Sequence, residues 1–338
     1  MTTQGDDTMY LSHNPTQDRL MALCRRAFPD CVQHMIGETY PIASRQHEMI
    51  AFKWGGRTPD GRLHHAPLIM RRYISTLSWW RPDDRGKAQR ETTICRWLHD
   101  EGFPVPQVYL REFGPRGDVV LFSWLPGQAL PVGERPLREA VEPYIDAFAL
   151  LLADLHRLEP PRDVQRVVPR VSLPGALANL AALAASIGTA ELSQAVEMVM
   201  ERAYDVPEVG PVLIHGDYHL LNARLQDGEI VGLVDWEYSA LGDPRWDVAN
   251  AYMQLVDFGA ADAADRFLSI YLDASGWEFE GEPLYNIVVP LQQWALSEWL
   301  IQQQAAGEMP EFSLAQDLIA LRDAYHHRAE MALQWLGR

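Results

Sequence analysis

Positive charge is scarce in this chain of 338 residues. It has 29 lysine and arginine residues against 46 aspartate and glutamate residues, and its formal net charge is −17 at pH 7. Nucleic-acid binding depends on neutralising phosphates with cationic side chains, so this deficit argues against a nucleic-acid partner. An acidic surface serves solubility, and it also favours cationic small molecules through electrostatic steering.

Cysteines and long hydrophobic runs are also scarce. The three cysteines, Cys24, Cys31 and Cys95, show no metal-binding spacing, which favours free or buried thiols. No apolar stretch approaches the roughly 20 residues that a membrane-spanning helix needs. The first residues, Met-Thr-Thr-Gln-Gly-Asp-Asp, lack the basic and apolar parts of a secretory signal. We therefore expect a cytoplasmic protein without a membrane partner, and nothing in the sequence indicates its oligomeric state.

Polar residues at fixed spacing stand out in residues 211–249. A short apolar run, 212–214, leads into the sequence His-Gly-Asp-Tyr-His-Leu-Leu-Asn, which occupies residues 215–222. A second apolar run, 230–234, ends on Asp235, and the Asp-Gly pair before it is a tight hairpin signal. Two short strands can therefore bring Asp217, Asn222 and Asp235 into one site.

This grouping of oxygen-bearing side chains is typical of phosphoryl transfer. The protein then mainly positions groups and holds Mg²⁺, which binds hard oxygen ligands. We expect Asn222 and Asp235 to be those ligands and Asp217 to accept the proton of an attacking hydroxyl. Asn222 follows Asp217 by five positions, as in the kinase pattern His-x-Asp-x-x-x-x-Asn, and Asp235 lies thirteen residues further on.

A simpler interpretation is that these residues only form turns. Asp, Asn and Gly collect in loops for backbone reasons alone. That interpretation does not explain two elements in the right order, each at the end of an expected strand. His219 is a second candidate catalytic residue, which either faces the γ-phosphate or caps the loop.

The motif residues 215–222, 234–238 and 242–247 resemble the aminoglycoside phosphotransferase / choline kinase family. The usual loop of that family is His-Gly-Asp-Leu-His-Pro-Gly-Asn, so a Leu-Leu pair here replaces Pro-Gly between the functional positions. The resemblance implies an α+β, two-lobed, protein-kinase-like fold. Residues 1–125 would form a nucleotide-binding N-lobe with an antiparallel sheet and a helix. Residues 126–338 would form a mainly helical C-lobe with the catalytic loop and acceptor-binding helices.

The resemblance also implies a cation that holds the phosphates of ATP. The apolar strand 67–73 ends in two arginines, of which Arg71 fits the expected register and Arg72 is the alternative. Glu91, in the expected helix 87–100, would pair with that arginine and orient it. The competing interpretation is an edge strand with two surface arginines.

Further nucleotide contacts are expected at a hairpin tip and at the link between the lobes. No Gly-x-Gly-x-x-Gly is present, so Ser44, Arg45 and Gln46 are either phosphate contacts or an ordinary hairpin tip. Ser123 and Leu125 lie in the link, where unpaired backbone groups would meet the edge of the adenine.

Helical segments after the motif are expected to complete the acceptor site. Trp294, Glu298 and Gln302 share one helix face with Trp299 on its flank, so this stripe either walls the acceptor site or is ordinary core. We expect His156 to be a buried, hydrogen-bonded group. Asp243 and Asp247 are expected to brace the catalytic loop through backbone hydrogen bonds.

The sequence therefore predicts an ATP- and Mg²⁺-dependent kinase that phosphorylates a hydroxyl of a small molecule. The acceptor could be an aminoglycoside, a macrolide, a choline-like amine, a homoserine-like amino acid, a sugar or a hydroxyacyl compound. A catalytically silent nucleotide-binding regulator would lack the base or a metal ligand, and all three are present. A protein kinase would have Asp-Phe-Gly where Asp-Trp-Glu stands here, and a longer activation segment after it.

Overall fold

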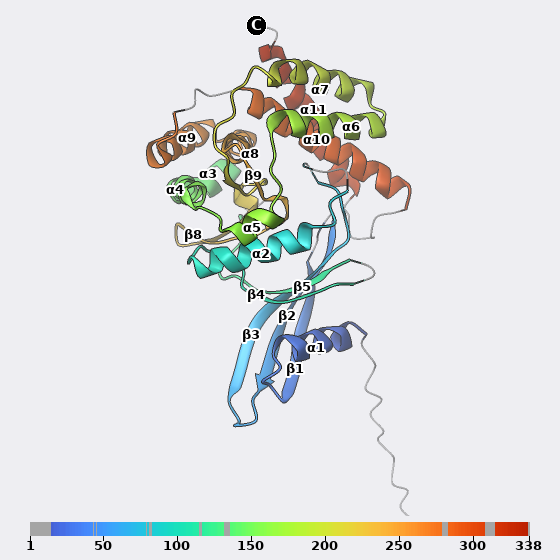
Figure 1. Ribbon diagram of the computed structural model, residues 1–338, viewed down its shortest axis with the longest axis vertical. Coiled ribbons are helices and arrows are strands. Elements are labelled where there is room, and N and C mark those ends of the chain that lie inside the picture. The colour runs from blue at the N-terminus through green and yellow to red at the C-terminus, as the bar shows by residue number, and fades with distance from the viewer. Residues whose placement is uncertain are drawn as a thin grey trace, which may run out of the picture.

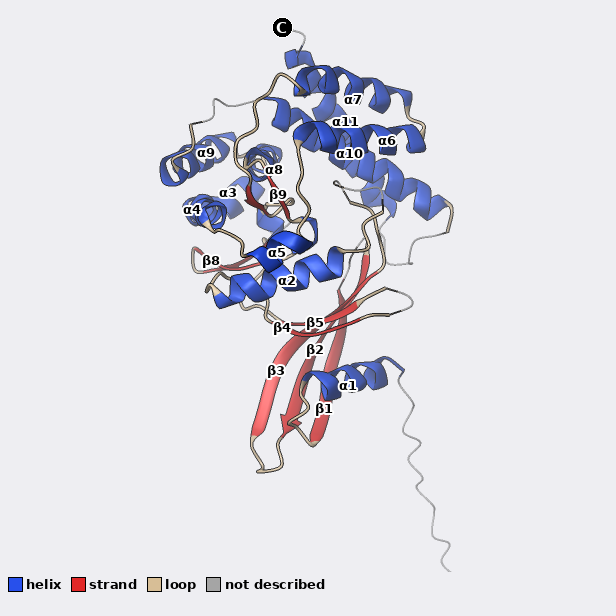
Figure 2. Cartoon of the chain, viewed as in Figure 1, coloured by secondary structure: helices blue, strands red, loops and turns tan. Residues whose placement is uncertain are grey.

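A computed structural model describes residues 15–42, 44, 46–78, 80, 83–114, 117–131, 136–278, 283–307 and 315–336. These residues form an N-terminal antiparallel sheet with helices beside it and a mainly helical region after it (Figures 1 and 2). The predicted α+β architecture is therefore confirmed. Among these residues, no helix combines the length and the apolarity that crossing a membrane requires.

The N-terminal sheet has five strands in the order β1-β2-β3-β5-β4, and every neighbouring pair is antiparallel. Helix α1 covers one face of it through apolar side chains such as Leu20 and Leu23, which pack with Phe52 and Leu68. These elements are α1 (Pro15–Ala27), β1 (Gln33–Ile42), β2 (His47–Arg57), β3 (Leu63–Tyr73), β4 (Val108–Glu112) and β5 (Val119–Ser123).

Helix α2 (Lys87–Asp100) lies between the sheet and the helical region (Figure 1). Its bounds are those that the sequence predicts. Ile94, Cys95 and Leu98 contribute its apolar packing. Its buried residues also include charged ones near its first turns, and these face the site described below.

Two small antiparallel pairs carry the polar motif. The hairpin of β7 (Ala223–Gln226) and β8 (Glu229–Leu233) turns through the predicted Asp-Gly pair, and both turn residues have positive φ. Strand β6 (Val212–Ile214) pairs with β9 (Ala240–Gly242), a three-residue strand that the sequence does not predict.

The helical region packs around two apolar cores. One core gathers α4, α8 and α9 around the polar motif, and the other gathers α6, α7 and α10. The proline-containing segment 160–174 holds α5 and the start of α6. The helices are α3 (Leu137–Val141), α4 (Ile145–Arg157), α5 (Arg162–Val167), α6 (Leu173–Ile187), α7 (Ala190–Ala203), α8 (Arg245–Asp257), α9 (Ala261–Ser275), α10 (Pro283–Ala305) and α11 (Ala315–Leu336), with 3₁₀ turns at Glu142–Tyr144, Leu220–Asn222 and Trp236–Tyr238.

Candidate active site

The loop of residues 215–222 leaves β6 in a conformation that requires glycine at its second position. Gly216 has φ 81°, and a Cβ atom there would lie 2.3 Å from the carbonyl oxygen of Tyr238. A larger residue would strain the backbone and push the two segments apart. Gly216 therefore lets the loop pass close to the segment that follows Asp235.

Asp247 holds the start of this loop from beneath. Its buried carboxylate, in the first turn of α8, accepts hydrogen bonds from the backbone N–H groups of His215 at 2.6 Å and Gly216 at 2.8 Å. His156 of α4 lies 3.2 Å from the same carboxylate, and its other ring nitrogen lies 2.8 Å from the hydroxyl of Tyr271. The predicted bracing role of Asp247 and the buried, bonded state of His156 are both confirmed.

Asp243 has a different role from the one predicted. Its carboxylate accepts hydrogen bonds from the N–H of Val209 at 2.8 Å and from the guanidinium of Arg245 at 2.6 Å. It therefore fixes the chain before β6 and the start of α8, and it does not bond to the catalytic loop. The prediction that Asp243 braces the loop directly is wrong, because the nearer donors of α8 and residue 209 occupy its oxygens.

Asp217 and Asn222 are joined within the loop. The side-chain amide of Asn222 donates to the backbone carbonyl of Asp217 at 3.0 Å and to its carboxylate at 3.1 Å. Burial alone would raise the pKa of Asp217, but the charge of His219 and hydrogen bonds from His219 and Asn222 outweigh it and hold this pKa below its usual value. Asp217 is therefore an anion at neutral pH that can accept a proton.

His219 lies against the carboxylate of Asp217. Its Nε2 is 3.2 Å from that carboxylate, whose charge and hydrogen bond raise the pKa of His219 although burial opposes this. Its Nδ1 is buried without a hydrogen-bond partner among the described residues. The structure thus places His219 beside the predicted base, and a contact of His219 with the γ-phosphate stays a prediction.

Asp235 lies just after β8 in a left-handed backbone conformation, with φ 67° and ψ 49°. Such a conformation is uncommon outside glycine, asparagine and aspartate, and it turns the chain sharply into the 3₁₀ turn Trp236–Tyr238. The side chain of Asp235 is 38% exposed. Its carboxylate therefore remains accessible while the chain around it is buried.

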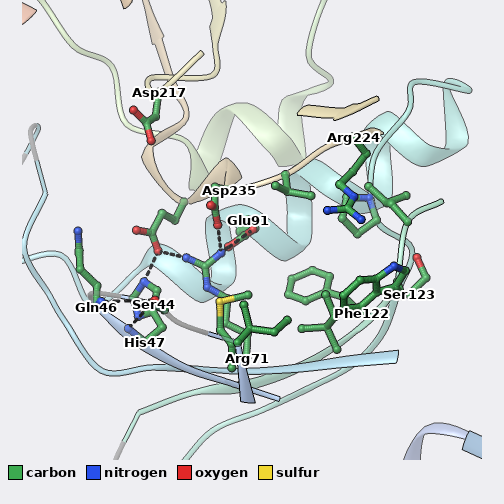
Figure 3. Close-up of a pocket in the computed structure, with 18 of the residues that line it drawn as sticks. Ser44, Gln46, His47, Arg71, Glu91, Phe122, Ser123, Asp217, Arg224 and Asp235 are labelled. Carbon is green, nitrogen blue, oxygen red and sulfur yellow. Dashed lines mark hydrogen bonds and ion pairs between the residues drawn. The ribbon is translucent and has the colours of Figure 1, made fainter. Parts of the chain in front are cut away.

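Arg71 of β3 joins three carboxylates. Its Nη1 lies 3.2 Å from both oxygens of Glu91 and 2.6 Å from Asp235, and its Nη2 lies 2.7 Å from Glu237 (Figure 3). The guanidinium is buried and also lies 4.8 Å from the ring centre of Tyr73. The expected pairing of a strand arginine with Glu91 is thus present in the geometry.

The two strand arginines face different surroundings. Arg72 forms an ion pair with Glu48 of the neighbouring strand, away from the carboxylates that surround Arg71. Burial raises the pKa of Glu91 to about 7, although the charge of Arg71 lowers it, and the hydroxyl of Tyr73 donates to the same carboxylate. Of the two candidates, Arg71 is therefore the one that the structure brings to Glu91.

Glu237 is a central residue that the sequence reasoning missed. Besides Arg71, its buried carboxylate contacts the ring of His47 and lies 3.5 Å from Nζ of Lys87. Burial alone would raise its pKa, but these neighbours hold that pKa well below its usual value. The sequence did hold a partial signal for this buried cluster of charges. Lys87 and Glu91 stand four positions apart on α2 and therefore share one helix face, which is buried.

A cavity of about 380 Å³ lies between the sheet and Asp217, and we call it the sheet-side cavity. Figure 3 shows Arg71 rising from the sheet toward Asp235 and Glu91, with Phe122 and Ser123 at the other end of the cavity. Most of the residues predicted to bind nucleotide line it, namely Ser44, Gln46, Arg71, Glu91, Ser123 and Leu125, and so do the predicted base Asp217 and the predicted metal ligand Asp235. Arg45, predicted with Ser44, lies outside the described residues.

The backbone N–H of Ser123 is paired, unlike the prediction, whereas a contact of its carbonyl with the adenine edge stays a prediction. Its N–H donates to the carbonyl of Gln107 at 2.9 Å, and its hydroxyl accepts from the N–H of Gln107 at 2.9 Å. Trp124 likewise donates its N–H to Pro67. The N–H of Ser123 is therefore not available to a ligand, because strand pairing uses it. Of the two predicted hinge residues, Leu125 remains the candidate for an N–H contact.

A second cavity, of about 520 Å³, lies on the other side of Asp217, and we call it the helix-side cavity. His219 and Asn222 line it, together with residues of α8, α10 and α11. The residues that line both cavities are Gln46, Asp217, Asp235 and Tyr238. The two carboxylates of the motif therefore lie where one cavity meets the other.

The tryptophan stripe of α10 belongs to the core. Trp294 is buried, stacks on His326 with ring centres 4.2 Å apart, and lies 3.4 Å from Glu298. Gln302 donates to the carbonyl of Ile187 in α6 at 2.9 Å. On α10, the helix-side cavity is lined instead by Val289, Pro290, Gln293 and Leu296. The stripe residues do not line this cavity although α10 itself does, so the geometry favours the interpretation of the stripe as core.

A substitution at Trp294 tests this assignment. Trp294→Ala should lower the free energy of unfolding by about 3–5 kcal/mol, because it empties a filled core position. Gln293→Ala, the neighbouring residue on the cavity side, should change it by less than about 0.5 kcal/mol. Chemical denaturation of both variants measures the difference, and equal effects would contradict the assignment.

The sequence profile described as the phosphotransferase enzyme family, APH, matches residues 61–285, which is more than half of the chain. The chain belongs to the phosphotransferase enzyme family. The matched range includes Arg71, Glu91 and the whole polar motif, so the family resemblance inferred from the motif is confirmed.

Individual members of the phosphotransferase family are only distantly similar. Hygromycin-B 4-O-kinase of Escherichia coli is 34% identical over 64 residues, which is 19% of this chain and only 18% of that protein. A thermostable mutant of the aminoglycoside phosphotransferase APH(4)-Ia, in a ternary complex with ADP and hygromycin B, has a TM-score of 0.62 at 13% identity, over 95% of this chain and 98% of that one.

A second solved structure shows the same fold with a different substrate. The amicoumacin kinase hAmiN, in complex with AMP-PNP and Ca²⁺, has a TM-score of 0.59 at 14% identity, over 94% of each chain. At such identities the similarity shows the fold alone. The protein-kinase-like fold of the family is thus shown over nearly the whole chain.

Proposed function

We propose that this member of the phosphotransferase family is a small-molecule kinase that transfers the γ-phosphate of ATP to a hydroxyl group. The observation that carries the proposal is the place of Asp217 and Asp235 on the shared boundary of the two cavities. A nucleotide in the sheet-side cavity and an acceptor in the helix-side cavity would meet at these two carboxylates.

The two parts of the chain divide the task in this proposal. Residues 1–125 hold the nucleotide, with Arg71 on its phosphates, Glu91 orienting that arginine, and Ser44 at the hairpin tip. The backbone of Leu125 meets the adenine edge. Residues 126–338 supply the catalytic loop and the acceptor cavity. The buried contacts of Arg71 support its role, because three carboxylates fix the guanidinium in one position.

Magnesium fits the residues present. Asn222 uses its amide N–H₂ on Asp217, so its oxygen is the atom suited to a metal, and both it and Asp235 line the helix-side cavity. Mg²⁺ needs only one or two protein oxygens, because it keeps waters and binds substrate phosphates. When bound there it would neutralise charge on the phosphate oxygens.

Asp217 would act on the acceptor. In the proposed reaction the acceptor oxygen forms a bond to the γ-phosphorus, the bond from that phosphorus to ADP breaks, and the hydroxyl proton passes to the carboxylate of Asp217. The lowered pKa of Asp217 keeps it ionised before the transfer. A base of this kind suffices, because deprotonation can accompany phosphoryl transfer.

A peptide acceptor fits the structure less well. Between Asp235 and the start of α8 at Arg245, the chain holds only the 3₁₀ turn Trp236–Tyr238 and strand β9. Most of these residues are buried. A buried segment of this length offers no surface loop on which a peptide could lie.

A screen of hydroxyl compounds tests the proposed function. The purified chain is incubated with Mg·ATP and each compound, ADP release is measured, and mass spectrometry identifies phosphorylated product. We expect acceptor-dependent ADP release for at least one class of compound. ATP binding without turnover on any compound would favour a regulator, and transfer to protein substrates would favour a protein kinase.

Asp235→Asn provides a more specific test. This variant removes the carboxylate that would hold Mg²⁺, so the apparent affinity for Mg²⁺ should fall by at least about 10-fold. Titration of Mg²⁺ at a fixed concentration of a fluorescent ATP analogue measures this change. Asp217→Asn serves as the comparison, since it should leave the metal dependence nearly intact. An unchanged metal dependence in Asp235→Asn would mean that Asp235 is only a turn residue.

A further inference from the structure

An ion pair formed by residues outside the catalytic loop lies in the wall of the helix-side cavity. Asp257 is the last residue of α8, and Arg328 comes from α11; the Nε of Arg328 is 2.5 Å from the carboxylate of Asp257. Both side chains line the cavity and are mostly buried. We call these two residues the Asp257–Arg328 pair.

This pair changes the charge that an acceptor would meet. Among the described residues that line the cavity, the carboxylates are Asp217, Asp235 and Asp257. The proposed reaction uses the first two, and Arg328 neutralises the third. No described carboxylate of the lining is then left for the ammonium groups of a polycationic acceptor.

Apart from His219, which lies beside Asp217 and whose pKa that carboxylate raises, the remaining polar groups of the lining are uncharged. The helix-side cavity presents the amides of Asn250, Gln254 and Gln293. Gln254 is already engaged, because its side-chain oxygen accepts a hydrogen bond from the N–H of Leu220 in the catalytic loop at 2.8 Å. Amides suit hydroxyl and carbonyl groups, but they do not replace carboxylates as partners for several cations.

Arg328 is the arginine among the described residues of this lining. A guanidinium has five N–H donors, and the recorded bond to Asp257 uses the one on Nε. The plane of the guanidinium is also supported by Tyr325, whose ring centre lies 4.9 Å away. Two contacts therefore hold this arginine in the cavity lining, and the remaining donors of a guanidinium form a fork that would match a carboxylate.

The burial of Asp257 agrees with a supporting role for this residue. Burial raises the pKa of Asp257 to about 6, although the charge and hydrogen bond of Arg328 lower it. Its ionised form therefore depends on Arg328. A cationic acceptor group would have to share this carboxylate with the arginine.

The other side of the cavity is apolar. Met253 of α8 and Val289, Pro290 and Leu296 of α10 line it. These side chains would pack against a hydrocarbon or aromatic frame rather than against a fully hydrated sugar. The lining thus combines an apolar wall, neutral amides and one oriented arginine.

We propose that the acceptor is a hydroxyl compound that carries a carboxylate on an apolar frame, and that Arg328 binds this carboxylate. Asp257 positions the arginine, and because Arg328 already takes up its charge, it attracts a cationic acceptor less than a free carboxylate would. The inference rests on the proposed kinase function. The net charge of the chain favours a cationic acceptor, whereas this inference predicts an anionic one. The reason is that the acceptor meets the charges of the cavity wall and not those of the whole surface.

Three compounds with one frame test the inference: para-(hydroxymethyl)benzoate, para-(hydroxymethyl)benzamide and para-(hydroxymethyl)benzylamine. They share an apolar ring and a primary hydroxyl and differ only in the charge of the opposite group. We expect the wild type, with Mg·ATP, to use the benzoate with a kcat/KM at least about 10-fold above that of the benzylamine. Hygromycin B, as an aminoglycoside, should be used no better than the benzylamine.

Variants of Arg328 assign the preference to this residue. Arg328→Met should raise KM for the benzoate by about 10-fold or more, with little change in kcat, in KM for ATP or in KM for the benzamide. Arg328→Lys keeps the charge without the fork, so it should recover part of the loss. Arg322→Met is the matched control on the same helix, since Arg322 contacts Asp323 at 2.7 Å and is not among the lining residues.

The outcomes separate this inference from the function on which it rests. A wild type that binds Mg·ATP but shows no preference for the benzoate, or that prefers the benzylamine or hygromycin B, overturns the inference alone. A preference that survives Arg328→Met also overturns it. A wild type that does not bind Mg·ATP counts against the proposed kinase function. Thermal melting of each variant excludes misfolding as the cause of a raised KM.

Discussion

Replacing Asp217 by asparagine should abolish turnover and leave ATP binding nearly unchanged. Asparagine keeps the size of the side chain and can still accept the hydrogen bond from Asn222, but it cannot take up the proton of an attacking hydroxyl. The loss of rate should be about 10²–10⁴-fold, the usual contribution of a positioned base. Nucleotide affinity should be retained, because the base acts on the acceptor side of the shared boundary.

The measurement compares ADP release with the binding of a fluorescent ATP analogue. Asp227→Asn is a matched control with the same chemical change in the same part of the chain. Asp227 is exposed at the tip of the β7–β8 hairpin, with φ 51°, a conformation that asparagine also tolerates. Wild-type turnover in Asp217→Asn would show that the base has been assigned to the wrong residue. Loss of both activities would indicate a collapsed loop instead.

The features that the sequence predicted best depend on local patterns. The sequence predicts helix α2 at residues 87–100 because an apolar periodicity there is bounded by Gly86 and by the Gly-Phe-Pro sequence after residue 101. The hairpin around residue 227 follows from its Asp-Gly pair. Asp217, Asn222 and Asp235 come together because each stands at the end of a short strand, where the chain must turn.

The parts of the site that the sequence did not predict depend on contacts between segments that are distant along the chain. Glu237 meets His47, Arg71 and Lys87, which come from two strands and a helix of the N-terminal part. No local pattern states that a carboxylate in a short turn will be buried among them. The spacing of charges on α2 was a partial signal, but it does not identify their partner.

The orientation of α10 was missed for another reason. This helix has apolar residues around most of its circumference, so residues on several faces are buried, among them Leu291, Trp294 and Leu300. A regular spacing then identifies a helix without showing which face meets a cavity. The tryptophans drew attention because of their size, whereas the cavity is lined by smaller residues on another face.

Removing the cation at Arg71 should affect both folding and nucleotide binding. In Arg71→Met, the buried carboxylate of Glu91 loses its ion-pair partner, while Glu237 keeps His47 and Lys87. Breaking one side of a buried pair typically costs about 3–5 kcal/mol. Because the pKa of Glu91 is already about 7 with Arg71 present, its carboxyl would take up a proton at neutral pH, which places the expected loss at the lower end of that range. We therefore expect a loss of this size in the free energy of unfolding, together with weak binding of ATP.

Arg71→Lys separates the two effects. It restores a positive charge near Glu91, so it should recover much of the stability, but one ammonium group cannot replace a fork whose Nη1 meets Glu91 and Asp235 while Nη2 meets Glu237. Affinity for ATP should remain below that of the wild type, because the cation is no longer held in one position.

Arg72→Met is the control, since Arg72 pairs with Glu48 outside this cluster. Chemical denaturation and titration with a fluorescent ATP analogue measure the two quantities. If Arg72→Met weakened ATP binding and Arg71→Met did not, the phosphates would be held by the neighbouring arginine, and the cluster around Arg71 would be purely structural.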